Sequence, residues 1–505
     1  MRNFHCLLIS PASIFDPKDP FTTGVVYMPI GLAYGASALQ GDGAIVSVLD
    51  IFGEDPKKAE EIGNYIRLGA SNEKMIERIS LIQPDLVIFY ANQVLNHIAL
   101  IQSMSIVKKH FPKLLIGVAE NTQAVTSYLL TEVADELFDN GADFILSGEM
   151  EDTLVELLDG IQKGSSISTL NIDGLSTKGN VRARMSRVLN LDNLSFPAWD
   201  LFPIKNYWNL GYAHGPFESH SYLPLLTSRG CPFPCKFCVV PSTNNRKWRF
   251  RSPRNVVDEI EYLTNKFGVY EFHLEDLNPT IQDSRMRDLS LEIINRGLEI
   301  NWKIVAGTKI ESIKSIETLR LMNKAGLSYL SMSPESGSEK VLKDIGKPFD
   351  VKHAEKMIRE SYRLDIKTQA CFVLGYPTEK FIDRLRSLFL VFRLSIAGVD
   401  EIVVFMMSPV PGSEVYKKYL GQFDSLSSLS FSPRWRSDFY SLLVWRTIMY
   451  LVFLVTKFFR NPIRMLRQIE NLGTGEFQTK MEMTPVRGLK YLMIYMRLKN
   501  KKCSS

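Results

Sequence analysis

Three cysteines stand close together near the middle of the chain. Cys231, Cys235 and Cys238 form a CxxxCxxC run that is preceded by Gly230 and contains two prolines between its first two cysteines. Thiols on such a loop can converge on one soft metal centre without regular structure between them. Bacterial ferredoxin and structural zinc sites use four protein ligands, so three thiols without a nearby fourth Cys or His leave one coordination position open. The spacing favours an iron–sulfur centre over a disulfide; a zinc knuckle and three unrelated core thiols are the alternatives.

The composition indicates an intracellular enzyme. The chain has 505 residues, of which 45% are hydrophobic, enough for two or three domains with separate cores. Only 6 cysteines occur, so no disulfide framework is apparent and a reducing compartment is expected. The apolar N-terminal run is short and leads into a proline and charged residues, which predicts a first strand and not a signal peptide.

The cysteine run resembles the radical S-adenosylmethionine enzymes, whose CxxxCxxC triad holds a 4Fe-4S cluster. In that family the iron without a cysteine ligand chelates S-adenosylmethionine, and one electron from the cluster splits this cofactor to a 5'-deoxyadenosyl radical. The resemblance implies that Phe237, just before the last cysteine, packs beside the adenine. It also implies an electron donor such as flavodoxin or ferredoxin.

The first 164 residues predict an α/β domain. Short apolar runs alternate with helical patterns, and five such units predict a doubly wound parallel sheet. The predicted strands are 4–10, 44–50, 85–91, 114–118 and 143–147. The small residues Gly31 and Gly35 in the first helix allow either a close ligand or close helix packing.

This first domain resembles the cobalamin-binding domain that is fused to one large class of radical S-adenosylmethionine enzymes. In that class the corrin ring lies across the carboxyl ends of the strands, and Gly148 and Glu149 match a Gly-Glu turn near the nucleotide tail. The DxHxxG motif, whose histidine coordinates cobalt, is missing. His97 and His110 could replace the missing cobalt ligand, but the simpler interpretation is that they are surface or helix-end histidines. Glu120 stands near the place where relatives have a glycine pair.

A polar, Pro- and Asn-containing stretch, 165–205, predicts a linker, and the residues from 206 to 425 predict a partial (β/α)6 barrel. Ser252, Pro253 and Gly268 mark the start and end of its first helix. The triad follows the first strand, at the carboxyl end where barrel active sites are built. The predicted strands are 222–228, 270–275, 301–306, 328–333, 367–374 and 401–408.

Several residues at the ends of these strands match family elements that contact S-adenosylmethionine or substrate. Glu275 and Asp276 end the second strand, where the family places acidic or polar residues facing the amino group of the cofactor. Glu335 matches a Glu-Ser-Gly element, although Ser333 and Pro334 depart from the usual pattern. Simple chain reversal or helix capping explains these residues as well. The remaining elements are the turns Gly375-Tyr376-Pro377 and Pro409-Val410-Pro411-Gly412-Ser413.

Three further residues have structural interpretations. Cys371 lies in the middle of a predicted strand and is expected in the core. Arg249 and Arg251, which follow the triad, are expected to form ion pairs or to lie on the surface.

The C-terminal residues 426–505 predict a hydrophobic and basic helical tail. From 431 onward, 14 Lys or Arg stand against 4 Asp or Glu, while the whole chain has a net charge of only +5. Residues 439–459 are largely apolar, but Arg446 and Lys457 leave too few uncharged residues between them to span a bilayer, which needs about 20. An in-plane membrane anchor and a helix packed on the barrel are both compatible with this pattern. No nucleic-acid recognition module accompanies the basic residues.

The resemblance implies radical chemistry on an unactivated carbon, most simply methylation of a hydrophobic small molecule or lipid with cobalamin as the methyl carrier. An oxidative cyclase of the porphyrin-ester type has the same domain order, and a cluster-binding protein without catalysis is a further alternative. A cytoplasmic location with peripheral membrane contact through the tail is expected.

Overall fold

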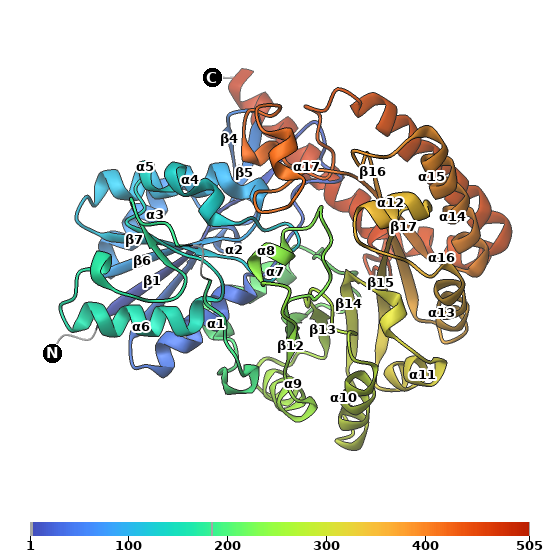
Figure 1. Ribbon diagram of the computed structural model, residues 1–505, viewed down its shortest axis with the longest axis horizontal. Helices are drawn as coiled ribbons and strands as arrows, with labels where there is room; N and C mark the ends of the chain where they lie inside the picture. The colour runs from blue at the N-terminus through green and yellow to red at the C-terminus, as the bar shows by residue number, and fades with distance from the viewer. Residues whose placement is uncertain (1–3, 183–184, 504–505) are drawn as a thin grey trace.

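The structure is a computed structural model that describes residues 4–182 and 185–503. Two six-stranded sheets lie side by side, the first built from the N-terminal part of the chain and the second from the middle (Figure 1). Both have helices packed on them. This confirms the predicted α/β class, with a doubly wound sheet followed by an open parallel barrel.

The first sheet has the strand order β3-β1-β6-β7-β8-β9. Its first five strands are parallel, and each coincides with a predicted strand. The apolar run of β6 is buried along its whole length, as expected for a strand covered on both faces. The strands are β1 (His5–Ser10), β3 (Ile45–Asp50), β6 (Leu86–Ala91), β7 (Leu115–Glu120), β8 (Phe144–Leu146) and β9 (Leu175–Thr177), and the helices are α1 (Ile30–Gly41), α2 (Ile51–Glu54), α3 (Asn72–Ile82), α4 (His97–His110), α5 (Ala134–Asp139) and α6 (Met150–Gln162).

The strand β9 corrects the prediction of a polar linker over 165–205. It pairs antiparallel with β8, and Gly148 forms a further bridge with Ser186, so this stretch completes the edge of the first sheet. Trp199, later in the same stretch, is fully buried. A three-residue strand between polar residues has no periodicity that sequence patterns can detect.

A small antiparallel sheet was also not predicted. It consists of β2 (Ser13–Phe15), β5 (Tyr65–Leu68) and β4 (Ala59–Ile62), in that order. These strands have three or four residues each, and β4 is largely charged. Their pairing therefore depends on contacts distant in sequence rather than on a local pattern.

The second sheet has the strand order β10-β13-β14-β15-β16-β17 and is parallel throughout. All six predicted barrel strands are present. They are β10 (Leu223–Leu225), β13 (Glu271–Leu274), β14 (Asn301–Thr308), β15 (Leu327–Glu335), β16 (Lys367–Leu374) and β17 (Glu401–Met406). The helices of this part are α7 (Ile204–Trp208), α8 (Val240–Thr243), α9 (Pro253–Phe267), α10 (Asp283–Asn295), α11 (Ile316–Lys324), α12 (Glu339–Asp344), α13 (Val351–Arg363) and α14 (Phe381–Ala397).

The helix α9 shows why these elements form where they do. The Ser252 hydroxyl accepts a hydrogen bond from the Asn255 N–H, Pro253 occupies the first turn, and Gly268 ends the helix in the left-handed conformation. Its apolar face is buried against the sheet. The predicted start and end of this helix are both confirmed.

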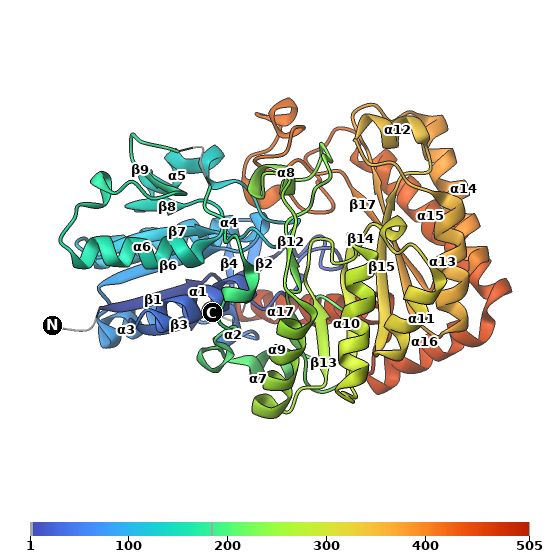
Figure 2. The same cartoon turned by 60° about the horizontal axis from the view of Figure 1, so that its bottom comes forward.

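The tail forms three helices, α15 (Phe439–Arg460), α16 (Pro462–Thr474) and α17 (Lys480–Cys503). α15 packs against α14 and β17, so the alternative of a helix packed on the barrel holds for one of its faces. α17 contacts both β17 and β4, and in Figure 2 it runs from the barrel towards the first domain. The tail is therefore part of the two-domain body.

The N-terminal end of α17 lies between the two edge strands of the open barrel. The Phe477 N–H donates to the Phe217 carbonyl shortly before β10, and the Met481 N–H donates to the Glu401 carboxylate at the start of β17. The tail thus covers the gap that the sheet leaves open.

Candidate active site

The three cysteines lie on a loop that is closed by a short antiparallel ribbon. Its strands are β11 (Ser228–Arg229) and β12 (Arg249–Phe250), and the loop between them also contains α8. Gly230 begins the loop with φ +80°, and a Cβ at this position would lie 2.0 Å from the Lys247 carbonyl oxygen. Only glycine fits this close approach, which fixes where the cysteine loop leaves the ribbon.

The three thiols are free and partly buried. Burial raises the pKa of Cys235 to about 11 and that of Cys238 to about 12, and their mutual repulsion as thiolates acts in the same direction. The ammonium groups of Lys347 and Lys309 act against this on Cys235. Two lysines beside a buried set of thiols suit a bound group that brings negative charge with it.

The chemistry of this donor set fits a thiolate-bound iron–sulfur cluster. Across residues 4–182 and 185–503, no three His, Cys, Asp or Glu side chains lie close enough together to hold a metal ion as they stand. In a 4Fe-4S cluster each thiolate binds a different iron, so the three thiols need not meet at a single ion. The three cysteines remain the predicted ligands.

Glu335 lies beside this loop in a strained conformation. It ends β15 with φ +62°, is buried, and its Oε1 lies 2.5 Å from Lys347 Nζ. Burial disfavours the charge on Lys347, but Glu335 and the nearby thiols outweigh it, so the pKa of this lysine is raised. Glu335 was predicted as a cofactor contact, whereas its partner Lys347 was missed because it lies twelve residues away on a different turn.

Phe237 lies against Tyr376 from the Gly-Tyr-Pro turn after β16. The two ring centroids are 5.5 Å apart in an edge-to-face arrangement. The cysteine loop and the fifth strand end thus meet through an aromatic pair, which offers a flat surface next to Cys238. The predicted contact of Phe237 with an adenine is compatible with this placement and remains a prediction.

Glu275, predicted to face the amino group of the cofactor, forms a partly buried pair with His214. The His214 Nδ1 atom lies 2.7 Å from Glu275 Oε2. Burial lowers the pKa of His214, and the pKa of Glu275 is also lowered because charges nearby outweigh its burial. The two side chains hold each other in place at the end of β13.

Lys480, from the start of α17, faces the same group. Its ammonium donates to the Val305 carbonyl on β14 at 2.8 Å, and the charges of Cys371, Glu401 and Glu275 act on it. Burial lowers its pKa nevertheless. The tail thus contributes a partly buried lysine to the inside of the barrel, which no pattern in the sequence indicated.

Asp276, next to Glu275, fixes the start of the cysteine loop. Its carboxylate accepts hydrogen bonds from the Thr227 N–H at 2.8 Å, the Thr227 hydroxyl at 2.7 Å and the Ser228 hydroxyl at 2.5 Å. These bonds hold the strand end two residues before Gly230. The role of Asp276 here is structural.

The carboxyl ends of the two sheets face each other, and the cysteine loop lies between them. Asn244, just after α8, donates to the Thr122 carbonyl at 3.0 Å, and the Leu129 N–H donates to the Pro411 carbonyl at 3.0 Å. Cys231 and Cys238 pack against a core cluster made mainly of first-domain side chains. A group bound to the cysteines and a group bound on the first sheet would therefore be neighbours.

Glu120 lies at the end of β7 on this edge. Its carboxylate accepts the N–H groups of Leu130 at 3.0 Å and Gly148 at 3.3 Å. Burial raises its pKa to about 8. Glu120, which departs from the family pattern, therefore holds two loops of the first domain through their N–H groups.

The Gly148–Glu149 turn is fixed by its surroundings. Gly148 has φ +93°, and a Cβ there would lie 2.2 Å from the Ser186 carbonyl oxygen. The Glu149 carboxylate lies 2.6 Å from Arg249 and accepts the Val188 N–H at 2.7 Å. The expected ion pair of Arg249 is confirmed, and it joins the two domains.

Two further arginines follow the same pattern. Arg229 is buried and lies 2.7 Å from Glu151, and Arg251 forms a buried pair with Glu259. Cys371 is buried in β16, as predicted.

The carboxyl edge of the first sheet also carries unsatisfied polar atoms. Among the described residues, Ser147 Oγ and Gln123 Oε1 are buried without a hydrogen-bond partner. An unpaired buried polar atom costs about 1–3 kcal/mol, so such atoms are expected where a polar ligand binds. These orphaned groups fit a large polar cofactor such as a corrinoid at this edge.

Neither His97 nor His110 is free for a metal. His97 is buried, with Nδ1 2.8 Å from the Tyr128 hydroxyl and Nε2 3.2 Å from Glu136. His110 lies at the end of α4, and its Nδ1 bonds to the Ile106 carbonyl. This agrees with the interpretation of both as structural.

Gly31 and Gly35 have a packing explanation. A Cβ at Gly31 would lie 2.3 Å from the Tyr90 hydroxyl, and one at Gly35 would lie 2.7 Å from the Met150 sulfur. The two glycines therefore let α1 approach β6 and α6 closely.

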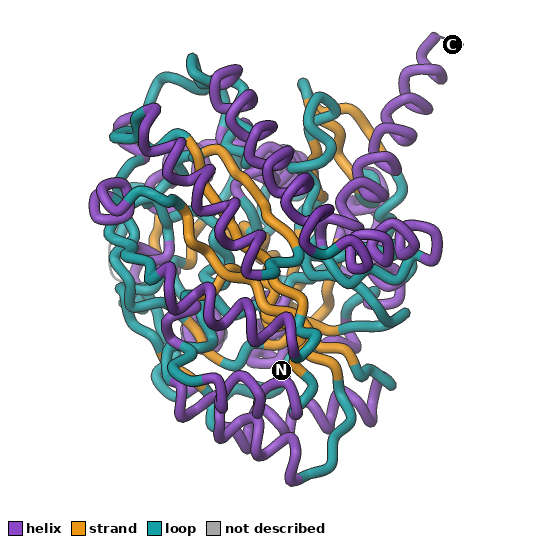
Figure 3. The backbone as a smooth tube through the Cα atoms, turned by 90° about the vertical axis from the view of Figure 1, so that its right-hand side faces the viewer, coloured by secondary structure: helices purple, strands orange, loops and turns teal. Residues whose placement is uncertain are grey.

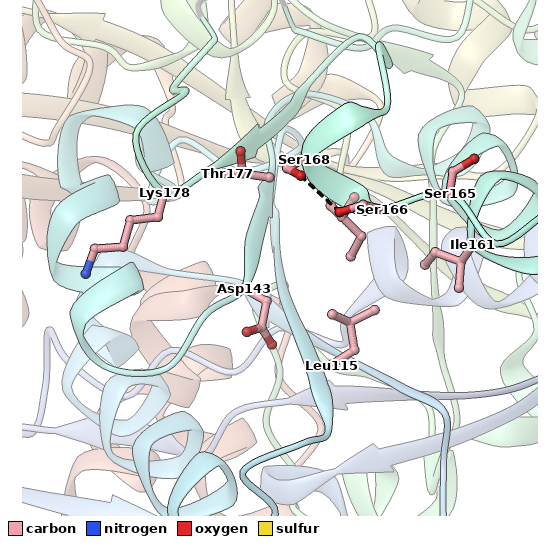
Figure 4. Close-up of a pocket in the computed structure, with 9 residues that line it drawn as sticks. Leu115, Asp143, Ile161, Ser165, Ser166, Ser168, Thr177 and Lys178 are labelled. Carbon is pink, nitrogen blue, oxygen red and sulfur yellow. Dashed lines mark hydrogen bonds between the residues drawn. The ribbon is translucent and has the colours of Figure 1, made fainter.

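An open surface pocket of about 520 Å³ lies away from the cysteines (Figure 4). Leu115 and Asp143, at the amino-terminal ends of β7 and β8, line it together with Lys178. It therefore lies at the opposite edge of the first sheet from Ser147. Its position excludes it from the chemistry of the cysteine loop.

Known proteins show the same arrangement. Residues 225–391 match the Radical SAM superfamily. The chain is 26% identical over 454 residues to cytidylyl-2-hydroxyethylphosphonate methyltransferase of Streptomyces wedmorensis, with 82% of both chains covered. It is 29% identical over 324 residues to anaerobic magnesium-protoporphyrin IX monomethyl ester cyclase of Cereibacter sphaeroides, covering 61% of this chain and 49% of the cyclase.

Solved structures extend the likeness in fold to both domains. The cobalamin-dependent S-adenosylmethionine radical enzyme OxsB superposes with a TM-score of 0.62 at 16% identity, covering 85% of this chain and 57% of OxsB. The radical S-adenosylmethionine methyltransferase TsrM of Kitasatospora setae gives a TM-score of 0.61 at 16% identity, covering 83% of this chain and 78% of TsrM. Residues 225–391 thus form a radical S-adenosylmethionine domain, and the chain shares the two-domain fold of OxsB and TsrM.

Proposed function

We propose that this protein is a cobalamin-dependent radical S-adenosylmethionine methyltransferase that acts on an unactivated carbon. The observation that carries this proposal is the position of the cysteine loop between the facing carboxyl ends of the two sheets. A bound cluster would supply the electron that cleaves S-adenosylmethionine, and a bound corrinoid would supply the methyl group. The similarity to a methyltransferase over 82% of both chains supports methyl transfer as the outcome.

The residues of the barrel have separate tasks in this proposal. Cys231, Cys235 and Cys238 hold the cluster, and Lys347 balances its negative charge. Glu335 orients Lys347 and contacts S-adenosylmethionine, and Phe237 with Tyr376 offers an aromatic surface to the adenine. Glu275 can accept a hydrogen bond from the amino group of the cofactor only if His214 moves away. When the site is empty, Glu275 is proposed to hold His214.

In the first domain, Ser147 and Gln123 are proposed to hold the corrinoid through their orphaned polar atoms. Gly148 and Glu149 are proposed to shape the turn beside the nucleotide tail. The Glu149 carboxylate is already occupied by Arg249 and Val188 N–H, so it acts by fixing the turn. Cobalt has no histidine ligand from the protein in this proposal, because His97 and His110 are held elsewhere.

The proposed substrate is a hydrophobic small molecule or lipid with an unreactive C–H bond. A cluster is unnecessary for methylating an activated nucleophile, which supports an unactivated carbon. The electron is proposed to come from a flavodoxin or ferredoxin. We place the protein in the cytoplasm, with peripheral membrane contact through the tail.

Labelled methyl transfer tests this proposal. The purified protein is reconstituted with iron, sulfide and hydroxocobalamin without oxygen, then incubated with trideuteromethyl S-adenosylmethionine and a reductant. We expect a deuterated methylcobalamin in the wild type, detected by mass spectrometry. Ser147→Ala with Gln123→Ala should bind less corrinoid at unchanged iron content. A wild type that retains no corrinoid after gel filtration would contradict the cobalamin assignment.

A second candidate function is oxidative cyclisation, because the chain is similar to a protoporphyrin ester cyclase over 61% of its length. The two functions differ in the fate of the methyl group. A cyclase would consume S-adenosylmethionine without placing its label on the product. A protein that holds the cluster but forms no 5'-deoxyadenosine would be a cluster-binding protein without catalysis.

A further inference from the structure

Three adjacent helices on the outer side of the barrel, α14, α15 and α16, leave large apolar side chains exposed to water. A surface helix of a globular protein normally places polar side chains there. α14 and α16 also turn polar side chains towards the protein, an arrangement that we call inverted. Together their exposed apolar side chains form what we call the apolar face. It consists of Phe381, Ile382, Leu385, Phe389, Phe392, Ile396, Tyr440, Val444, Leu451, Val455, Phe458, Phe459, Ile463, Leu466, Ile469 and Leu472.

The helix α16 shows the inversion most clearly, because none of its residues is buried. Its polar side makes the contacts with the protein: Arg464 lies 2.8 Å from Asp400, and Gln468 donates to the Thr479 hydroxyl at 3.2 Å. Its apolar side faces outward, with Ile463 67% and Leu466 65% exposed.

The helix α15 has one buried apolar face and one exposed apolar face. Leu442, Met449 and Phe453 are fully buried against the barrel, whereas Phe459 is 80% exposed. The charged Lys457 is buried and donates to Gln468 on α16 at 2.5 Å. α15 is the helix in the described part of the chain that is long and apolar enough to cross a membrane. Its buried face makes leaving the barrel costly, so it is held parallel to the protein surface.

The barrel helix α14 continues the same face. Asp383, Ser387 and Ser395 are buried, whereas Phe381 and Phe389 are 65% and 61% exposed. This helix lies outside the hydrophobic tail, so no sequence pattern predicted that it would take part in a membrane contact. Its participation shows that the barrel itself contributes to the apolar face.

Helices cover this side of the molecule (Figure 3), and α15 packs against both α14 and α16. Phe381 on α14 and Trp445 on α15 have ring centroids 5.3 Å apart, and Arg384 donates to the Ser441 hydroxyl at 3.3 Å. Lys457 joins α15 to α16. The exposed side chains therefore belong to one continuous region, which is larger than scattered surface hydrophobics require.

The charges around this face are mostly positive. The three helices contain the acidic residues Asp383, which is buried, and Glu470. Of their basic residues, Arg384, Arg386, Arg393 and Arg464 form ion pairs with acidic residues and Lys457 is buried. The others are Arg446, Arg460 and Arg467. Arg460 and Arg467 are exposed beside Phe459 and Leu466. Aromatic and aliphatic side chains bordered by arginines suit the interface of a bilayer with anionic headgroups.

We infer that the apolar face of α14, α15 and α16 rests in the interface of an anionic lipid bilayer, with the helices parallel to the membrane plane. The bilayer covers the exposed apolar side chains, and the exposed Arg460 and Arg467 contact lipid phosphates. The inference does not depend on the reaction that the active site performs.

Vesicle flotation with full-length protein tests this inference. The vesicles contain equal parts of phosphatidylcholine and phosphatidylglycerol, and pure phosphatidylcholine vesicles serve for comparison. The variant Phe459→Ser, Ile463→Ser, Leu466→Ser changes exposed side chains and should fold as the wild type does. We expect its affinity for the anionic vesicles to fall by about tenfold or more, since three anchoring side chains are lost.

A matched control is the variant Leu81→Ser, Leu189→Ser, whose side chains are 74% and 77% exposed on the first domain. It should float as the wild type does. Arg460→Gln with Arg467→Gln should weaken binding to anionic vesicles and leave the weaker binding to phosphatidylcholine unchanged.

Three results would overturn the inference. The wild type does not float with anionic vesicles, the apolar-face variant floats as well as the wild type, or the anionic lipid makes no difference. Light scattering is run alongside. A dimer that the apolar-face substitutions convert to a monomer, without any lipid binding, would assign this face to a second copy of the chain instead.

Discussion

At the scale of single residues, the cysteine triad was predictable and its electrostatic surroundings were not. The spacing of Cys231, Cys235 and Cys238 is a local pattern, so it can be recognised without knowledge of the fold. Lys347, His214 and Lys480 come from other loops and from the tail, and only the fold brings them to the site. Glu335 was predicted from its motif, but its ion pair with Lys347 was not.

The Glu335–Lys347 pair leads to a prediction about cofactor binding. Glu335→Gln removes the charge that orients Lys347, so we expect the Kd for S-adenosylmethionine to rise about tenfold or more, a loss of about 1.4 kcal/mol. Iron content should be unchanged. Anaerobic equilibrium dialysis measures the Kd, with Glu339→Gln, an exposed residue nearby, as the control. Unchanged affinity would remove Glu335 from the cofactor site.

Glu120 leads to a prediction about pH. Burial raises its pKa to about 8 in the folded protein, above the ordinary value of 4.5 in the unfolded chain. Its contribution to stability is therefore fully present below pH 4.5 and is lost as the pH rises towards 8. Relative to Glu120→Gln, the wild type should lose up to about 1.4 kcal/mol of unfolding free energy per pH unit in this window.

Urea unfolding at several pH values between 5 and 8 measures this difference. The amide in Glu120→Gln has one accepting oxygen for two N–H groups, so the variant should be less stable than the wild type at pH 5 but have a flatter pH dependence. Parallel pH profiles for the two proteins would show that Glu120 does not titrate in this window.

At the scale of secondary-structure elements, the long apolar strands of both sheets were predicted because burial on both faces leaves a continuous apolar run. The six barrel strands and the caps of α9 are confirmed in this way. The short strands β2, β4, β5 and β9 were missed, because three or four residues show no reliable period. The course of α17 across two domains was missed for a different reason, since its partners are distant in sequence.

The turn at Gly148 leads to a prediction about strain. Gly148→Ala places a Cβ 2.2 Å from the Ser186 carbonyl at φ +93°, so we expect a loss of about 3 kcal/mol or more of unfolding free energy. Gly164→Ala is the matched control, since it has φ +81° and nothing within 4 Å of the added Cβ. It should lose about 1 kcal/mol. Equal losses, measured by urea unfolding, would show that the close approach at Ser186 does not matter.

At the scale of the whole molecule, the two domains are fixed to each other around the cysteine loop. Glu149 pairs with Arg249, Glu151 with Arg229, and Tyr491 of α17 donates to the Gly24 carbonyl. These contacts hold the two carboxyl edges at a set distance. Neither the pairing of these residues nor the facing edges could be predicted from patterns along the sequence.

The Glu149–Arg249 pair leads to a prediction about the interface between the domains. Arg249→Leu leaves the buried Glu149 carboxylate with the more distant Arg229 as its remaining cationic partner. We therefore expect a loss of about 3 kcal/mol of unfolding free energy. Arg254→Leu, at an exposed position on α9, is the control and should change stability by less than about 0.5 kcal/mol. An unchanged urea midpoint for Arg249→Leu would show that the pair does not hold the domains together.

The central claim is that the cysteine loop supports radical cleavage of S-adenosylmethionine. The most direct test is the yield of 5'-deoxyadenosine after anaerobic reconstitution and reduction, with iron measured in the same sample. The wild type is predicted to form 5'-deoxyadenosine, and the variant Cys231→Ala, Cys235→Ala, Cys238→Ala to form none. A wild type that carries a full complement of cluster iron and forms no 5'-deoxyadenosine would contradict the claim.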